Sequence, residues 1–211
     1  MGKLKKILKE EVKSFTGKTI INVDIQPEYE PAIHFSIPEW LEWLEQQSEN
    51  NKIVFLFNGT DTVGGVSEQE YISWLLNLCI ENDIDPDFIN GSYFYDKGYA
   101  FFRYCMDSGI DDDELVALIR FMVANDINDS RDIDSDNWKK FEKKYPEYPN
   151  LFKLLKDEMG EMINIPELMD ELRQYNNIVI MGGGVDECLK EVELALQSLD
   201  KSYITVPQFI F

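Results

Sequence analysis

Histidine and cysteine are scarce in this chain of 211 residues, which contains one histidine, His34, and three cysteines. Cys79, Cys105 and Cys188 are odd in number and far apart, so the sequence does not predict a disulfide framework. No Cys or His pair has the spacing of a metal site. A single histidine without a G-x-S-x-G motif gives no support to Ser-His-Asp catalysis. We therefore expect no metal site and no cofactor.

Long apolar runs and dense basic clusters are also missing. No apolar run approaches the ~20 residues that cross a bilayer, and the N-terminus lacks the apolar core of a secretory signal. The net charge of -20 argues against binding to a nucleic-acid backbone, which requires clustered lysine and arginine. We expect a cytoplasmic protein that binds neither nucleic acid nor membrane.

Hydrophobic residues make up 44% of the chain, which is enough for a single well-buried domain over 1–211. Within it, residues 1–18 contain six lysines and predict a basic amphipathic helix that packs on its own domain or on a neighbouring subunit, so a homo-oligomer stays open. Residues 107–165 are led by a helical pattern, 111–124, and then become polar and rich in proline. We interpret 107–165 as a helical insertion or small subdomain.

The remaining sequence alternates between short apolar runs and helical patterns. The runs lack a polar face, which is typical of parallel strands covered on both sides. Expected strands lie at 19–26, 52–57, the start of 93–106, 177–184 and 202–206. Expected helices begin at Pro38, after the capping-box residue Ser67, at Pro166 and at 186. The sequence predicts an α/β fold with a parallel, Rossmann-like sheet and helices on both faces, but not the order of the strands.

Polar residues follow three of these strands. Asp24 and Gln26 follow the first, Asn58 and Asp61 follow the second, and a glycine turn before Cys188 follows the strand at 177–184. Ligands of open parallel sheets bind beyond the carboxyl ends of the strands. We therefore expect a small-molecule site where these segments converge.

Cys188 is the candidate nucleophile. It lies in the first turn of its predicted helix, where the helix dipole favours a thiolate, and the amides of the glycine turn could hold an oxyanion. Two observations oppose this hypothesis. Acidic residues precede Cys188, and the cysteine shares one helical stripe with Val192, Ala195 and Leu199, as a small core residue would. The sequence leaves both hypotheses open.

Lys97 is a cation among aromatic residues in the segment YDKGYAFF. As an isolated residue it would be a surface lysine whose alkyl stem packs on apolar neighbours. With Asp24 and Cys188 it gains a role, since its charge would stabilise the thiolate while the carboxylate takes the thiol proton.

Three segments together resemble the isochorismatase-like cysteine hydrolases, the superfamily that includes nicotinamidases. They are VDIQPEY (23–29), DKGYAFF (96–102) and GGGVDECLKEVELAL (182–196). The resemblance implies that Asp24 is the general base, Lys97 its charge partner and Cys188 the nucleophile. It also implies a cis peptide at Gly183-Gly184, with the amides of Gly184 and Cys188 as oxyanion donors.

Substrate contacts are expected from Gln26, Tyr29, Asn58 and Asp61. The chain departs from the family pattern in several ways. Lys97 and Cys188 are 91 positions apart, which makes 107–165 an insertion, and the metal-binding pattern of nicotinamidases is missing. Two hypotheses follow. The first is a cysteine hydrolase of a small amide or related substrate. The alternative is a catalytically inactive protein on the same fold whose acidic surface binds a protein partner.

Overall fold

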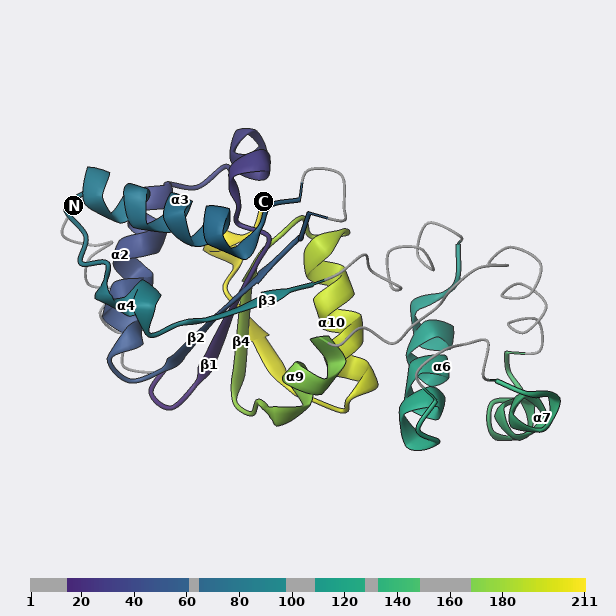
Figure 1. The fold of residues 1–211 in the computed structure, drawn as a ribbon. Coiled ribbons are helices and arrows are strands. Elements are labelled where there is room, and N and C mark those ends of the chain that lie inside the picture. Colours follow the sequence, from purple (N-terminus) through teal and green to yellow (C-terminus); the bar gives the residue numbers. More distant parts are fainter. Residues whose placement is uncertain (1–14, 61–64, 98–108, 128–132, 149–167) are drawn as a thin grey trace.

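The structure is a computed structural model that describes residues 15–60, 65–97, 109–127, 133–148 and 168–211. Figure 1 shows a central sheet with helices on both sides and two further helices extending from one side. Among the described residues, no helix has the length and apolarity needed to cross a membrane.

The central sheet has five strands, all parallel, in the order β3-β2-β1-β4-β5. The strands are β1 (Thr19–Val23), β2 (Lys52–Phe57), β3 (Tyr93–Asp96), β4 (Ile178–Gly182) and β5 (Tyr203–Thr205). The chain builds outward from β1 to β3, then returns to the other side of β1 to add β4 and β5. This arrangement is the doubly wound α/β fold that the sequence predicts.

Two apolar cores cover the two faces of the sheet, because successive side chains of a strand point to opposite faces. Ile21 and Ile180 belong to one core, and Phe55 and Val179 to the other. The first core includes residues of α9 (Leu168–Gln174) and α10 (Cys188–Ser198). The second includes residues of α2 (Ile37–Ser48), α3 (Glu68–Glu81) and α4 (Asp87–Asn90).

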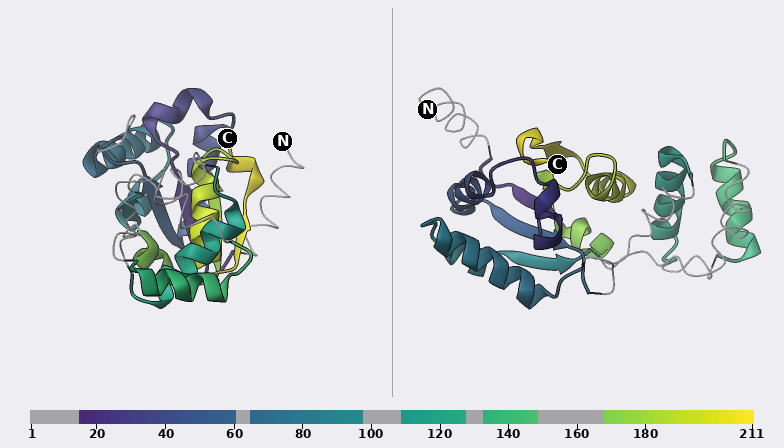
Figure 2. Two further views of the ribbon diagram at one scale, coloured as in Figure 1. Left: turned by 90° about the vertical axis from the view of Figure 1, so that its right-hand side faces the viewer. Right: turned by 90° about the horizontal axis from the view of Figure 1, so that it is seen from above.

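The described part of the insertion extends the first core outward from α10. Helix α6 (Asp112–Ala124) packs on α10, and α7 (Ser135–Lys144) packs on α6. Phe121 of α6 and Phe141 of α7 meet edge to face, with ring centroids 5.4 Å apart. Figures 1 and 2 show α10, α6 and α7 following one another away from the sheet.

Several expected boundaries are confirmed. Strand β2 covers 52–57, and the capping box of Ser67 and Glu70 is present at the start of α3. Helix α6 begins one residue after its cap, Asp111. Three expected strands are shorter than predicted. The first ends at Val23, because the next residue has a positive φ, and β4 and β5 cover only 178–182 and 203–205. Strand β3 covers the first four residues of 93–106, as expected.

Other features lie outside the prediction or outside the described residues. Three short helices were not predicted, since each is only one or two turns long: α4 and the 3-10 helices η1 (Pro27–Ala32) and η3 (Pro207–Phe209). Residues 1–14 of the expected N-terminal helix are not among the described residues, and 15–18 form a turn.

Candidate functional site

The site lies where the strand order reverses, between β1 and β4. The connections that leave these neighbouring strands run to opposite faces, the arrangement in which open α/β sheets bind ligands beyond the carboxyl ends of the strands. Val23 pairs with Gly182 at that edge, so Asp24 and the glycine turn emerge side by side. The sheet topology thus brings together two segments more than 150 positions apart in the sequence.

Asp24 leaves β1 in a left-handed backbone conformation, with φ of 49°. Its N–H donates to the carbonyl of Leu56 at 2.9 Å, and its side chain is fully buried. Aspartate enters this region more readily than most residues, but the conformation still costs free energy.

Lys97 follows β3 directly, and its side chain reaches Asp24 at the end of β1. Its backbone N–H donates to the Phe57 carbonyl at 2.7 Å, which extends the β2–β3 pairing by one residue. The side chain is only 3% exposed, and Nζ donates to Asp24 Oδ2 at 2.5 Å. Burial opposes the charge on Lys97, but the carboxylates of Asp24 and Glu191 raise its pKa above the ordinary value. The surface-lysine alternative is therefore wrong.

The glycine turn brings the backbone close to Cys188. Gly182 and Gly183 have φ of +81° and +65°. A Cβ on Gly183 would lie 2.8 Å from the Leu189 nitrogen and 3.2 Å from Cys188 Cβ, so a side chain there would push α10 away. Glycine is required at this position by both conformation and space.

The cis peptide expected at Gly183-Gly184 is wrong, since no cis bond occurs among the described residues. The chain reverses instead through two successive left-handed glycines. The Gly183 carbonyl accepts from the Phe211 N–H at 3.2 Å. In a trans peptide the carbonyl and the N–H of the following residue point in opposite directions. The Gly184 N–H therefore faces away from Phe211.

Cys188 is the first residue of α10 and is half-buried. It packs against the first apolar core, as the core-residue hypothesis predicts, and it also lies within electrostatic range of the Asp24 carboxylate. Asp24 Oδ1 is buried and has no hydrogen-bond partner among the described residues. The two hypotheses for Cys188 are compatible, because one side chain both packs on the core and lies near the carboxylate.

The thiolate that we expected at the helix N-terminus is not favoured in this structure. The pKa of the Cys188 thiol is raised to about 12, and burial is the main cause. The negative charge of Asp24 contributes to this rise and outweighs the Lys97 ammonium, which lowers the pKa. The substrate-free site therefore holds a thiol next to a carboxylate. This arrangement suits proton transfer from sulfur to Asp24 at the moment of attack.

Glu191 is the site residue that the sequence analysis missed. Its side chain is 5% exposed, and its Oε2 lies 2.7 Å from Lys97 Nζ. A signal exists in the sequence, because Glu191 follows Cys188 by three positions and so lies on the same side of α10. A carboxylate beside the apolar stripe of that helix is unusual enough to indicate a buried partner.

The expected substrate contacts form a hydrogen-bonded chain beside Asp24. Gln26 Oε1 accepts from the Asn58 backbone N–H at 2.9 Å, and Asn58 Nδ2 donates to the Tyr29 hydroxyl at 2.8 Å. Burial raises the pKa of Tyr29, and the negative charge of Asp24 raises it further, so the phenol lies within electrostatic range of the site. Asp61 lies outside the described residues.

No family model, curated protein or solved structure matches this chain. Its chemistry therefore has to be inferred from the side chains themselves. Within the ranges that the structure describes, no group of three or more histidine, cysteine, aspartate or glutamate residues could hold a metal ion.

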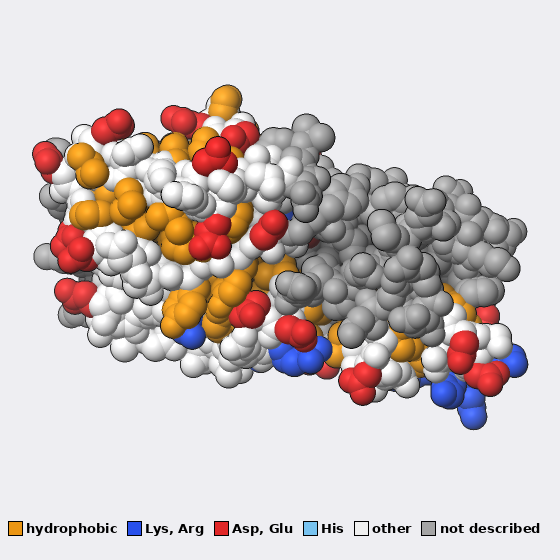
Figure 3. Space-filling view, in the orientation of Figure 1, with side chains coloured by type: hydrophobic (Ala, Val, Ile, Leu, Met, Phe, Trp, Pro, Cys, Tyr) orange, Lys and Arg blue, Asp and Glu red, His pale blue; other side chains and the backbone are white. Residues whose placement is uncertain are grey.

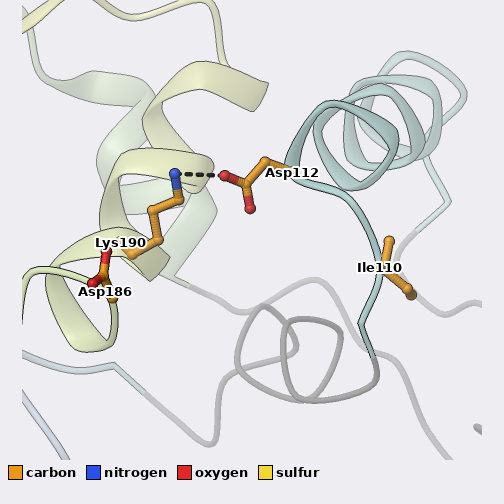
Figure 4. A pocket seen from close by; sticks show the side chains of 4 residues that line it. All are labelled: Ile110, Asp112, Asp186 and Lys190. Carbon is orange, nitrogen blue, oxygen red and sulfur yellow. Dashed lines mark ion pairs between the residues drawn. The ribbon is translucent and has the colours of Figure 1, made fainter.

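A pocket of about 310 Å³ lies next to the site, between the start of α10 and the start of α6. Its described lining consists of Ile110, Asp112, Asp186 and Lys190 (Figure 4). Lys190 reaches across to Asp112, with Nζ 2.5 Å from Oδ2. This ion pair joins the helix that carries the cysteine to the insertion.

Charged side chains are unevenly distributed on the face shown in Figure 3. Acidic groups are scattered over the sheet domain, whereas basic groups gather mainly at the end formed by α7. Helix α7 has Lys143 and Lys144 in its last turn, where cations interact favourably with the helix dipole.

Proposed function

We propose that the protein is a cysteine hydrolase, resembling the isochorismatase-like enzymes, that cleaves a small amide or related acyl compound. The observation that carries the proposal is the convergence of three side chains, distant in the sequence, at one edge of the sheet. Lys97 lies 2.5 Å from the Asp24 carboxylate, whose negative charge raises the pKa of the nearby Cys188 thiol. All three follow or face the carboxyl ends of parallel strands, where α/β enzymes bind their substrates.

In the first half of the reaction, Asp24 accepts the Cys188 proton while sulfur attacks the carbonyl carbon of the substrate. The carbonyl π electrons move to oxygen, and the amides of Gly184 and Cys188 are the proposed donors to that oxyanion. When the oxyanion collapses, the C–N bond breaks and the leaving amine takes the proton from Asp24. A thioester on Cys188 remains.

In the second half, Asp24 takes a proton from water as the water oxygen attacks the thioester carbon. The C–S bond then breaks, and sulfur recovers a proton from Asp24 to give the thiol and a carboxylic acid. Lys97 keeps its proton throughout and holds Asp24 in place. The role of Lys97 is thus electrostatic, while Asp24 carries every proton.

The test uses p-nitrophenyl acetate as a generic acyl donor. We expect the protein to release nitrophenol with turnover and to carry an acetyl group on Cys188, identified by peptide mass mapping of a rapidly quenched reaction. Asp24→Asn retains the size of the side chain but cannot take a proton. It should slow acylation by roughly 10²–10⁴-fold, the usual contribution of a general base.

Cys79→Ser is the matched control, because Cys79 is a buried thiol in the opposite core. It should react as the unsubstituted protein does, whereas Cys188→Ala should neither acylate nor turn over. Equal acylation of Cys188 in the Asp24→Asn variant would contradict the mechanism. Absence of any adduct on Cys188 would contradict the function.

The second candidate is a catalytically inactive protein that binds a protein partner. The raised pKa of Cys188 favours it, since a thiol is a weaker nucleophile than a thiolate. The net charge of -20 suits a basic partner. Such a complex should dissociate as ionic strength rises, and a complex indifferent to salt would argue against an acidic docking surface.

A further inference from the structure

Helix α2 presents a row of glutamates on one side. Glu39, Glu42, Glu45 and Glu49 follow one another at spacings of three or four residues, which makes them neighbours on the helix surface. Glu45 is half-buried and the other three are exposed. The helix contains no lysine or arginine, and none of the four glutamates forms an ion pair with a described residue. Like charges at this spacing repel one another, so a cationic partner along this row would stabilise the helix.

An aromatic surface lies where the described chain begins. The ring of Phe15 meets Trp43 of α2 edge to face, with ring centroids 6.0 Å apart. Trp43 contacts Phe209, whose ring centroid is 5.4 Å from that of Phe35. Phe35 contacts Phe211 in turn. Phe15, Phe35 and Phe211 are only half-buried, so part of this aromatic surface is open.

The aromatic surface adjoins the glutamate row. Trp43 follows Glu39 by four positions, so the two side chains are neighbours on α2, and Glu42 directly precedes Trp43. The ring that Phe15 contacts is therefore at the border of the row. A segment that covered both surfaces would need apolar side chains on one side and cations beside them.

The segment that directly precedes Phe15 has this composition. Residues 3–13 contain five lysines and two glutamates, so they carry a net positive charge. A helix of about 11 residues is marginal in water by itself and needs a surface to pack on. The apolar side of such a helix would consist of Leu4, Ile7, Leu8 and Val12.

We propose that residues 3–13 form a helix that docks in cis on α2, with its apolar side on the aromatic surface and its lysines along the glutamate row. Attachment through Phe15 supplies this segment at a local concentration on the order of millimolar, above that of a second molecule at ordinary protein concentrations. A basic partner that used the same row would have to displace it. The inference is independent of the hydrolase proposal, because the site around Cys188 takes no part in it.

Hydrogen exchange of the full chain, measured by mass spectrometry of peptides that cover 1–15, tests the docking. We expect the amides of 3–13 to exchange at least about tenfold more slowly than those of a synthetic peptide of the same sequence, because a free helix of this length opens readily. The double variant Glu39→Gln, Glu42→Gln retains the size and polarity of both side chains but removes their charges. It should speed the exchange by about fivefold, the combined effect of two exposed ion pairs.

The matched control is the double variant Glu142→Gln, Glu147→Gln, which removes the same charge from exposed residues of the insertion. It separates a local docking site from a general attraction to an acidic protein, and its exchange should match that of the unsubstituted chain. Equal acceleration in both double variants would overturn the proposal. So would amides of 3–13 that exchange as fast in the full chain as in the peptide.

Carbodiimide cross-linking identifies what occupies the row. This reagent joins a lysine to a glutamate only when the two side chains are in contact. We expect bonds between lysines of 3–13 and glutamates of α2 in the cross-linked monomer. The same bonds recovered only from a cross-linked dimer would show that a second copy supplies the lysines, and docking in cis would be wrong.

Discussion

Cys188 links the chemistry of the site to the stability of the fold. Its thiol is half-buried, contacts the first apolar core and lies within electrostatic range of the Asp24 carboxylate. The folded protein therefore prefers the neutral thiol more strongly than the unfolded chain does. Wherever the folded and unfolded states bind different numbers of protons, the free energy of unfolding depends on pH.

The direction of that change follows from the raised pKa. The folded-state pKa of Cys188 is about 12, against 9.0 for an unperturbed thiol. The stabilisation is complete below pH 9 and is lost as pH rises from 9 towards 12, because the unfolded chain loses its proton first. We expect the free energy of unfolding to fall more steeply over this range in the unsubstituted protein than in Cys188→Ala.

Urea unfolding at a series of pH values measures this difference. Cys79→Ala provides a comparison, since burial raises the pKa of Cys79 to about 11 and the same sign applies. Equal slopes for the unsubstituted protein and Cys188→Ala would contradict the assigned environment of the Cys188 thiol.

The sequence predicted Asp24, Lys97 and Cys188 as partners because each residue lies in a short local pattern at a strand or helix end. The trans peptide and the raised pKa of Cys188 could not be predicted in the same way. Both depend on how closely β4, α10 and the end of β1 approach, which is a matter of tertiary packing. Glu191 was missed because a glutamate on a helix is by default a solvated residue.

At the scale of the elements, Gly182 fixes how β4 ends against β1. A Cβ at this position would lie 2.3 Å from the Val23 carbonyl oxygen, and φ is +81°. Both the close contact and the left-handed conformation exclude a side chain. Gly182 also begins the turn that leads to Cys188. The end of β4 and the site therefore both require glycine at this position.

We expect Gly182→Ala to destabilise the fold by at least about 2 kcal/mol, because strain and overpacking add. Two alanine variants separate these causes in urea unfolding. Gly17 has a positive φ but open space around it, so Gly17→Ala should cost only the strain, about 1 kcal/mol. Gly91 has neither feature, and Gly91→Ala should be nearly neutral. A Gly182→Ala variant as stable as Gly91→Ala would contradict the close approach of the two strands.

The elements that the sequence predicted well have strong local signals. The run KIVFLF is followed by a turn and forms β2 with the predicted bounds. The capping box of Ser67 predicted the start of α3. The end of β1 was predicted too late, because Asp24 turns the chain away from β2 through its backbone conformation. Nothing in the composition of 19–26 reports that torsion angle.

For the molecule as a whole, the described helices of the insertion are part of the main core. One apolar cluster extends from Ile21 in the sheet through Leu194 of α10 and Leu118 of α6 to Phe141 of α7. The fold class was predictable, since apolar strands alternate with helices. The strand order was not predictable, because the reversal at β1 depends on which face of the sheet each connecting helix covers.

We expect the protein to unfold in a single cooperative transition, because no boundary divides this cluster. Phe141 is fully buried, so Phe141→Ala should cost about 3–5 kcal/mol and shift the whole transition. Tryptophan fluorescence reports both regions, since Trp138 lies in α7 and Trp40 in α2. Two separate transitions, with only the first displaced by Phe141→Ala, would show that the insertion folds independently.

Helix α10 meets its neighbours in several directions from its first turn. Cys188 and Glu191 face Asp24 and Lys97, while Lys190 between them pairs with Asp112 of α6. Each residue added to or removed from a helix rotates everything beyond it by about 100°. The spacing of Cys188, Lys190 and Glu191 is therefore as constrained as their identities. This stretch of the chain can change by substitution, but not in length.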